Sequence, residues 1–261
     1  MESIAAAYGS SPESSNSSSS DEEESSPFED EVTLNSEVHV GVKRKRSSEP
    51  QWTRAFPHVD GNWPSHVRID IPVTQKLRDV ATEIIKRTQE FVGDAVDVVP
   101  FEELEVGKEE QGLHLSLSRP FVLRYDQIDA FVDALRAVLK WRHRFSITLQ
   151  QVLVLLNDEK TRSFLALRVG EGEQHINRLL RCVDQCLEQF KQPTYYENPI
   201  PHVSIASSMG EELVKLTSDH NGSLTPRRVQ LEQLKTPICL TAGVVAVHVV
   251  IGNKHYDIPL Q

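Results

Sequence analysis

Two short stretches of the sequence decide how the chain is expected to fold. Residues 113–118 read Leu-His-Leu-Ser-Leu-Ser, and residues 202–207 read His-Val-Ser-Ile-Ala-Ser. In a β-strand, alternate side chains point to opposite faces of the sheet. Each stretch therefore predicts a strand with one apolar and one polar face. The polar faces carry His114, Ser116 and Ser118 in the first strand, and His202 and Ser204 in the second.

The polar faces hold side chains suited to phosphate-ester chemistry. Near neutral pH, one imidazole can be neutral while another is protonated, so two imidazoles that flank a phosphate can act as base and acid in one transesterification. A neighbouring serine hydroxyl can donate to the non-bridging oxygens, whose charge grows in the transition state. We expect this site to need no metal or other cofactor. A single His-x-Ser stretch is usually structural, and it is the matched pair that favours a catalytic site.

Hydrophobic periodicity around these stretches predicts further strands and helices. Strands are expected over residues 67–71, 95–99, 239–250 and 255–258, and helices over 77–92, 128–139 and 176–190, with Thr74 as the first N-cap and Phe91 on the buried face of that helix. Apolar runs at 147–156 and 163–169 are separated by a short polar loop, which predicts a β-hairpin. Because hairpins are antiparallel, the sequence predicts an α+β fold rather than a doubly wound one.

The charge of the chain is distributed unevenly. The formal net charge is −10, of which −7 falls in residues 1–50, so residues 51–261 carry only −3. The first 50 residues include 14 serines and the acidic run 20–24, which is typical of a disordered tail. The basic cluster Lys43–Arg46 is either a nuclear-import signal or a solvated charge run, and we favour import. We therefore expect a tail at 1–50 and one folded domain at 51–261, and we exclude a histone-like basic binder.

Cysteine use and hydropathy indicate where such a protein works. Cys182, Cys186 and Cys239 are too few and too scattered for a disulfide framework, which suits a reducing compartment. The first residues have neither a basic region nor a continuous apolar run, so we expect no secretory signal. The longest apolar stretch, 238–252, is too short to span a bilayer. We expect a soluble intracellular protein without a membrane partner.

Together these motifs resemble the 2H phosphoesterase superfamily, whose members carry two H-x-S/T tripeptides in separate halves of an α+β chain. More closely, the chain is similar to the U6 snRNA phosphodiesterase family. The closer resemblance rests on Phe-Pro-His-Val-x-Gly-Asn-Trp at 56–63, His-Leu-Ser-Leu-Ser at 114–118, Glu-Lys-Thr-Arg at 159–162, Tyr-Tyr-Glu-x-Pro-x-x-His-Val-Ser at 195–204 and Gly-Asn-Lys at 252–254. It extends over residues 52–261, and the combination of motifs is specific.

The resemblance implies a bilobal fold with two antiparallel sheets and flanking helices around a central cleft. It implies a nuclear 3′-to-5′ exoribonuclease that trims the oligouridine tail of U6 snRNA and leaves a 2′,3′-cyclic phosphate, which some members open further. His114, Ser116, His202 and Ser204 stand at the family's catalytic positions, and Tyr196 stands where the family has a base-stacking aromatic residue. We add Ser118 as a substrate-binding candidate and leave the role of Tyr195 open. The expected partner is the single-stranded 3′ end of RNA, bound by a monomer.

Two other functions stay open at this point. A 2′,3′-cyclic phosphodiesterase or a 2′-5′ RNA ligase would share both His-x-Ser strands but act on a different substrate. A non-catalytic RNA-processing scaffold would keep the fold without using the histidines. The residues also do not assign which histidine is the base and which the acid.

Several other residues look functional but are expected to be structural. The cations that flank Trp141 at 140–144 resemble an RNA-binding patch, yet they also end a predicted helix, where they offset its C-terminal dipole. Cys182 and Cys186 are one helical turn apart without neighbouring ligands, so a metal site is not expected. His175, at a helix start, and His248, inside a strand interpreted as buried, have no repeated hydroxyl neighbour.

Overall fold

A computed structural model describes residues 59–105, 112–217, 227–228 and 238–261. These residues belong to a compact unit that spans Thr53–Gln261. The predictions for the serine-rich tail, for Lys43–Arg46 and for residues 51–58 lie outside the described residues. In the described ranges, no helix is long and apolar enough to cross a membrane.

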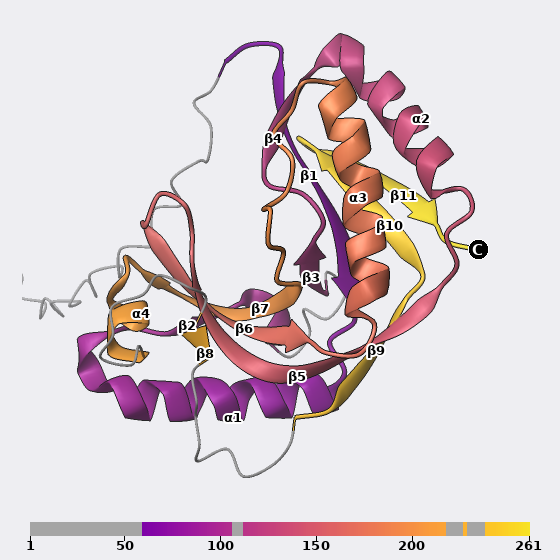
Figure 1. The fold of residues 1–261 in the computed structure, drawn as a ribbon. Helices are drawn as coiled ribbons and strands as arrows, with labels where there is room; N and C mark the ends of the chain where they lie inside the picture. Colours follow the sequence, from indigo (N-terminus) through magenta and orange to yellow (C-terminus); the bar gives the residue numbers. More distant parts are fainter. Residues whose placement is uncertain (1–58, 106–111, 218–226, 229–237) are drawn as a thin grey trace, which may run out of the picture. The chain divides into compact units, whose positions relative to one another are not determined.

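The strands form two antiparallel sheets (Figure 1). Sheet A has the order β11-β10-β1-β3, with β4 also paired to β1, and sheet B has the order β2-β7-β6-β5-β8, with β9 also paired to β5. The strands of sheet A are β1 (Asn62–Ile71), β3 (Leu113–Ser116), β4 (Phe121–Arg124), β10 (Ala246–Ile251) and β11 (Lys254–Pro259). Those of sheet B are β2 (Val99–Pro100), β5 (Phe145–Leu156), β6 (Arg162–Val169), β7 (His202–Met209), β8 (Arg227–Arg228) and β9 (Leu240–Val244). The predicted α+β fold with two antiparallel sheets is confirmed.

Two of the helices connect the two sheets. The α-helices are α1 (Gln75–Val92), α2 (Ile128–Leu139), α3 (Glu173–Gln189) and α4 (Glu212–Thr217), and short 3-10 turns lie at Gly93–Ala95, Glu102–Leu104 and Tyr125–Gln127. Helix α1 follows β1 of sheet A but contacts β7 of sheet B, whereas α3 follows β6 of sheet B and packs beside α2 over sheet A (Figure 1). Each of these helices therefore follows a strand of one sheet and packs against the other sheet, so the two sheets are built from interleaved stretches of chain.

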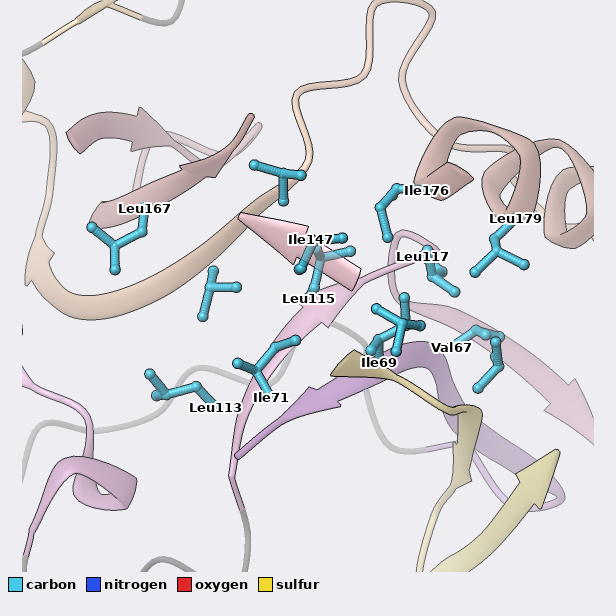
Figure 2. Packing of buried hydrophobic residues seen from close by; sticks show 14 of the residues in the cluster. Val67, Ile69, Ile71, Leu113, Leu115, Leu117, Ile147, Leu167, Ile176 and Leu179 are labelled. Atoms are coloured by element: carbon cyan, nitrogen blue, oxygen red, sulfur yellow. The ribbon is translucent and has the colours of Figure 1, made fainter. Parts of the chain in front are cut away.

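The predicted periodicities explain the main elements. In β1, Val67, Ile69 and Ile71 are at most 1% exposed, as expected for the inner face of a strand. Helix α1 begins after Thr74, whose hydroxyl accepts a hydrogen bond from the Leu77 amide at 3.2 Å. Buried side chains from both sheets and from α3 meet in one cluster (Figure 2). Burying each large aliphatic side chain in this cluster contributes about 1.5–3 kcal/mol.

One glycine brings two distant motifs together. Gly252, in the turn between β10 and β11, has φ +57°, which glycine tolerates and other residues rarely adopt. A Cβ built on Gly252 would lie 2.6 Å from Trp63 Cε3, so only glycine lets the turn pack against this ring. The ammonium of Lys254 lies 5.6 Å from the centre of the same ring. The Gly-Asn-Trp and Gly-Asn-Lys segments are therefore neighbours in space.

Three expectations about the elements are wrong. Phe91 is 62% exposed, because Thr88 and Val92 occupy the buried stripe in the last turns of α1. The strand expected over 95–99 is a 3-10 turn at Gly93–Ala95 followed by β2, which is only two residues long. The single strand expected over 239–250 is divided between β9 in sheet B and β10 in sheet A. Periodicity could not detect this division, because the apolar pattern continues across the passage from one sheet to the other.

Candidate active site

The two His-x-Ser strands show the predicted alternation. In β3, Leu113 and Leu115 are buried while His114 and Ser116 are partly exposed. In β7, Val203 and Ile205 are fully buried while His202 and Ser204 are partly exposed. Each strand therefore packs its apolar face against the core and carries an imidazole and a hydroxyl on its other face.

The fold brings these strands together from different sheets. Strands β3 and β7 contact each other, although β3 belongs to sheet A and β7 to sheet B. The imidazoles of His114 and His202 also interact electrostatically, since His114 lowers the pKa of His202. The two histidines that the sequence singled out thus lie within electrostatic range of each other.

The ring of His202 contacts the backbone of the segment that precedes β7. Its Nδ1 lies 2.7 Å from the carbonyl oxygen of Ile200. Because a carbonyl oxygen only accepts hydrogen bonds, Nδ1 carries the proton, which leaves Nε2 for proton transfer. Burial lowers the pKa of His202, the bond to Ile200 opposes this, and His114 adds a smaller lowering. The Ile200 contact therefore orients the ring and supports its charged form.

The pKa of His114, unlike that of His202, is influenced by several charged side chains. Burial lowers its pKa first, and the positive charge of Arg68 lowers it further. The carboxylates of Glu103 and Asp70 act in the opposite direction. Both charged residues of β1 are strand neighbours of this site, since Asp70 pairs with His114 and Arg68 pairs with Ser116 in the register of β1 and β3.

A third imidazole lies next to His114. The ring centres of His66 and His114 are 6.5 Å apart. Burial lowers the pKa of His66 to about 4, with further lowering by Arg68, His114 and His255. His66 is therefore neutral at physiological pH and adds no positive charge beside His114.

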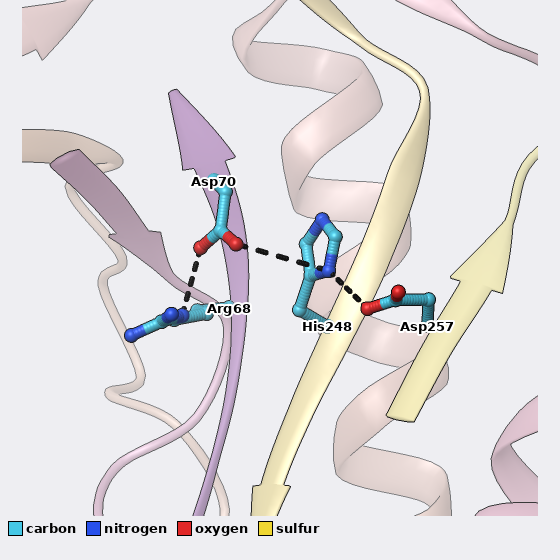
Figure 3. Close-up of polar contacts among 4 residues, drawn as sticks. All are labelled: Arg68, Asp70, His248 and Asp257. Carbon is cyan, nitrogen blue, oxygen red and sulfur yellow. Dashed lines mark hydrogen bonds and ion pairs between the residues drawn. The ribbon is translucent and has the colours of Figure 1, made fainter. Parts of the chain in front are cut away.

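A polar network continues from Arg68 across sheet A (Figure 3). Arg68 Nε lies 2.7 Å from Asp70 Oδ1, and Asp70 Oδ2 lies 3.8 Å from His248 Nδ1. The same nitrogen of His248 lies 2.7 Å from Asp257 Oδ1. His248 lies in a strand that is largely buried, as predicted, but its own side chain lies on the polar face of β10 and is 24% exposed.

The residues of this network were missed at the sequence level, although a signal for them exists. His66, Arg68 and Asp70 alternate with the buried Val67, Ile69 and Ile71 of β1. The alternation predicts that they share the polar face of that strand. It does not reveal which strand lies beside them, and only the pairing of β1 with β3 places them next to His114.

Tyr196 and Tyr195 have different surroundings. Tyr196 is 47% exposed, and the guanidinium of Arg119 lies over its ring, 5.1 Å from the ring centre. Arg119 also forms an ion pair with Asp158 in the loop between β5 and β6. Tyr195 packs against the hydrophobic core, and its backbone amide donates to Asp184. The exposed ring of Tyr196 is the one that remains accessible to a base.

Ser118 does not share the site. It is 3% exposed, and its hydroxyl accepts a hydrogen bond from the Val67 amide at 2.8 Å. Strand β3 ends at Ser116, so the alternation that put Ser118 on the polar face does not extend to it. Its contact ties β3 to β1, which is a structural role.

The structure also describes the cysteines and the histidine that the sequence analysis interpreted as structural. Cys182 and Cys186 are buried free cysteines on α3, and burial raises the pKa of the Cys186 thiol to about 11. The ring of His175 stacks on Phe145 with ring centres 4.9 Å apart. Within the part of the chain that the structure describes, no group of three or more potential ligands is arranged to hold a metal ion.

The two-sheet fold and the contact between the two His-x-Ser strands agree with the resemblance to the 2H phosphoesterases. Sequence comparison gives a closer relationship. The chain is 31% identical over 208 residues to U6 snRNA phosphodiesterase 1 of Bos taurus and equally to that of Homo sapiens, with 80% of this chain and 73% of each relative covered. The profile of a family described as "HVSL: Uncharacterised conserved protein" matches residues 17–259. The chain belongs to the U6 snRNA phosphodiesterase family.

Solved structures support the fold. Usb1 from Kluyveromyces marxianus matches with a TM-score of 0.54 at 15% sequence identity. The same protein with uridine monophosphate matches with a TM-score of 0.57 at 17% identity. Each match covers 76% of this chain and 98% of the other chain. These similarities show a shared architecture of sheets and helices.

Proposed function

We propose that this chain is a 3′-to-5′ exoribonuclease that trims the 3′ oligouridine tail of U6 snRNA and leaves a 2′,3′-cyclic phosphate. The substrate is the one for which its relatives are named, the U6 snRNA phosphodiesterase 1 proteins of Bos taurus and Homo sapiens. The observation that supports the chemistry is the contact of β3 with β7, because it brings His114 and His202 within electrostatic range of each other. The general acid–base scheme needs such a pair.

The reaction uses the ribose hydroxyl of the penultimate nucleotide. One histidine removes the proton of the 2′-OH, and the 2′-oxygen forms a bond to the adjacent phosphorus. The bond from phosphorus to the 5′-oxygen of the last nucleotide breaks, and the other histidine gives its proton to this leaving oxygen. No water is consumed. In the first cut the last nucleoside is released with a 5′-hydroxyl, and the shortened RNA ends in a cyclic phosphate. In each later cut the released unit carries this cyclic phosphate, and a new one forms on the RNA.

The serines stabilise the charge that develops in this step. Ser116 and Ser204 each follow a histidine by two residues and share its strand face. Their hydroxyls can donate to the non-bridging oxygens of the pentacoordinate phosphorus, where negative charge accumulates. Ser118 is left out of this proposal because its side chain is buried, with 3% exposure.

Recognition of a single-stranded end requires a stacking surface more than base-edge contacts. Tyr196 supplies this surface in our proposal, because Arg119 covers one side of its ring and the side chain remains half exposed. The base of the terminal nucleotide then stacks on the free side. The Usb1 protein of Kluyveromyces marxianus was solved with uridine monophosphate, which agrees with a pocket for such a nucleotide in that protein.

We further propose that the protein works in the nucleus, where U6 snRNA is processed for splicing. The basic cluster Lys43–Arg46 supplies the import signal in this proposal. The relatives named for U6 snRNA agree with this location.

The decisive experiment incubates the purified full chain with 5′-labelled oligouridine RNA in the presence of EDTA. We expect stepwise shortening from the 3′ end and a cyclic phosphate on each product. A substrate with a 2′-deoxy sugar at the penultimate nucleotide should not be cleaved, because the attacking hydroxyl is missing. Continued cleavage of this substrate would contradict the mechanism.

The same assay separates the alternative functions. Turnover of only a small 2′,3′-cyclic nucleotide, with the long RNA left intact, would favour a cyclic phosphodiesterase. Joining of RNA ends would favour a ligase. Activity that is lost with EDTA and restored by a divalent metal would contradict the metal-independent scheme.

A further inference from the structure

The polar face of β1 carries a guanidinium directly beside the proposed phosphate site. Arg68 is the strand partner of Ser116 on one side, in β3, and of His248 on the other side, in β10. Paired residues in neighbouring strands have their Cβ atoms about 5 Å apart and share one face of the sheet. The long side chain of Arg68 therefore starts next to the hydroxyl of Ser116, on the face that also carries His114.

The guanidinium is held by one of its edges. Arg68 Nε forms an ion pair of 2.7 Å with Asp70 Oδ1, and the Arg68 side chain is only 21% exposed. Asp70 itself is flanked by His248, which Asp257 holds from β11 (Figure 3). Among the described residues, neither Nη nitrogen of Arg68 donates a hydrogen bond, and Asp70 is the carboxylate that pairs with the side chain. The network therefore orients the side chain and leaves its remaining donors unused.

The charge of Arg68 acts on the site. It lowers the pKa of both His114 and His66, so the guanidinium lies within electrostatic range of the two rings. A cation beside imidazoles that must handle a proton opposes their charged forms. An anion bound between these groups removes this conflict, because it attracts the guanidinium and any protonated imidazole alike.

We propose that Arg68 is a further catalytic residue of this chain, whose Nη groups donate to a non-bridging oxygen of the scissile phosphate beside Ser116. This proposal deepens the function proposed above and rests on it. While the 2′-oxygen attacks and the 5′-oxygen leaves, the non-bridging oxygens gain negative charge. Arg68 stabilises this charge without taking part in any bond that forms or breaks, and Asp70 is its positioning residue.

Rates of the Arg68 variants provide the first test. Arg68→Ala should lower kcat/KM for oligouridine RNA about 100-fold, the usual effect of removing one donor to a developing oxyanion. Arg68→Lys should recover only part of this loss, because an ammonium keeps the charge but not the two-pronged geometry. Asp70→Asn should lower kcat about 10-fold, because the guanidinium keeps its charge but loses its anchor.

The matched control is Arg136→Ala. Arg136 is an exposed arginine of α2 that forms a 3.1 Å ion pair with Asp133, so its loss removes the same charge and the same kind of pair away from the site. This variant should keep the wild-type rate. Thermal unfolding of all variants checks that each remains folded. If Arg68→Ala retains the wild-type rate, or if Arg136→Ala loses as much activity, the proposal is wrong.

A sulfur substitution tests the contact itself. RNA in which one non-bridging oxygen of the scissile phosphate is replaced by sulfur has a weaker hydrogen-bond acceptor at that position. In one stereoisomer this should slow the wild-type enzyme about 10-fold but leave Arg68→Ala little affected, because the contact is already absent. If Arg68 had only a structural role, the Arg68→Ala substitution would lower the rates with the oxygen and the sulfur substrate by the same factor. The variant would then keep the 10-fold sulfur effect of the wild-type enzyme, and that outcome would overturn the proposal.

Failure of this proposal can be told apart from failure of the proposed function. If wild-type protein does not cleave oligouridine RNA, the exonuclease proposal is wrong, and calorimetric binding of uridine 3′-monophosphate then tests Arg68. Arg68→Ala should bind this probe about 10-fold more weakly than wild type, and Arg136→Ala should bind it equally well. If wild type cleaves the RNA and Arg68→Ala matches it in rate and in response to sulfur, only the role of Arg68 is wrong.

Discussion

The strands of His114 and His202 have the same local sequence pattern but different neighbours. Beside β3 runs β1, which places Asp70 opposite His114 and Arg68 opposite Ser116. Beside β7 runs β6, which places Arg168 opposite His202 and Ala166 opposite Ser204. Arg168 forms a 3.3 Å ion pair with Glu173 and is not among the charges that shift the pKa of His202.

The difference shows how two equivalent histidines acquire different properties. After burial, the largest influence on the pKa of His114 is the charge of Arg68, whereas for His202 it is the hydrogen bond to the Ile200 carbonyl. Fixed charges can be removed by single substitutions, but a backbone carbonyl cannot. The His114 side is therefore tunable by the residues of β1, and the His202 side is set by the path of the chain before β7.

The largest effect is expected from removing either imidazole. His114→Ala and His202→Ala should each lower the rate of oligouridine cleavage about 1,000-fold, because acid and base act as a unit. Single-turnover assays measure the rate, and binding of a 2′-deoxy oligonucleotide serves as the control, which should change little. A variant that retains most of its activity would restore the scaffold interpretation.

The two serines should differ because only one has a guanidinium beside it. Ser204→Ala should lower kcat about 100-fold, whereas Ser116→Ala should lower it less, since Arg68 can stabilise part of the same charge. In the Arg68→Ala background, Ser116→Ala should become as harmful as Ser204→Ala. Equal effects of the two serines in the wild-type background would argue against this asymmetry.

A smaller effect is expected at the aromatic ring that the two sides share. Arg119 follows β3, and its guanidinium lies over Tyr196, which precedes β7. Tyr196→Ala should raise KM for oligouridine about 10-fold through loss of base stacking, while Tyr196→Phe should keep the wild-type KM. Equal KM values for the two variants, measured by initial rates, would exclude stacking.

The smallest effect concerns stability rather than rate. Burial lowers the pKa of His66 to about 4 from an unfolded value near 6.5, so the unfolded chain binds more protons between these two pH values. His66 therefore favours unfolding progressively as the pH falls from about 6.5 towards 4, and it has no such effect above 6.5. Thermal melts of His66→Gln should show a weaker decline of Tm across this interval than wild type. An identical decline would mean that His66 retains its ordinary pKa.

Much of the local structure follows from short-range patterns. The hairpin over β5 and β6, helices α1 to α3 and the alternation in β3 and β7 were all predicted, because each depends on neighbours a few residues apart. The prediction for Ser118 failed for the same reason. The apolar–polar alternation of the sequence continues past Ser116, but strand β3 ends there. The network of Arg68 and Asp70 was not predicted, because their role depends on the strand that pairs with β1.

From the sequence alone came the two His-x-Ser faces, the class of fold and the family resemblance, because alternation and motif spacing are written in consecutive residues. Only the tertiary structure decided that β3 meets β7, that a guanidinium lies beside one serine and an alanine beside the other, and that residues 239–250 serve both sheets. The physical reason is that strand pairing joins residues far apart in the chain. Its register is selected by the packing of the whole core, which no local pattern contains.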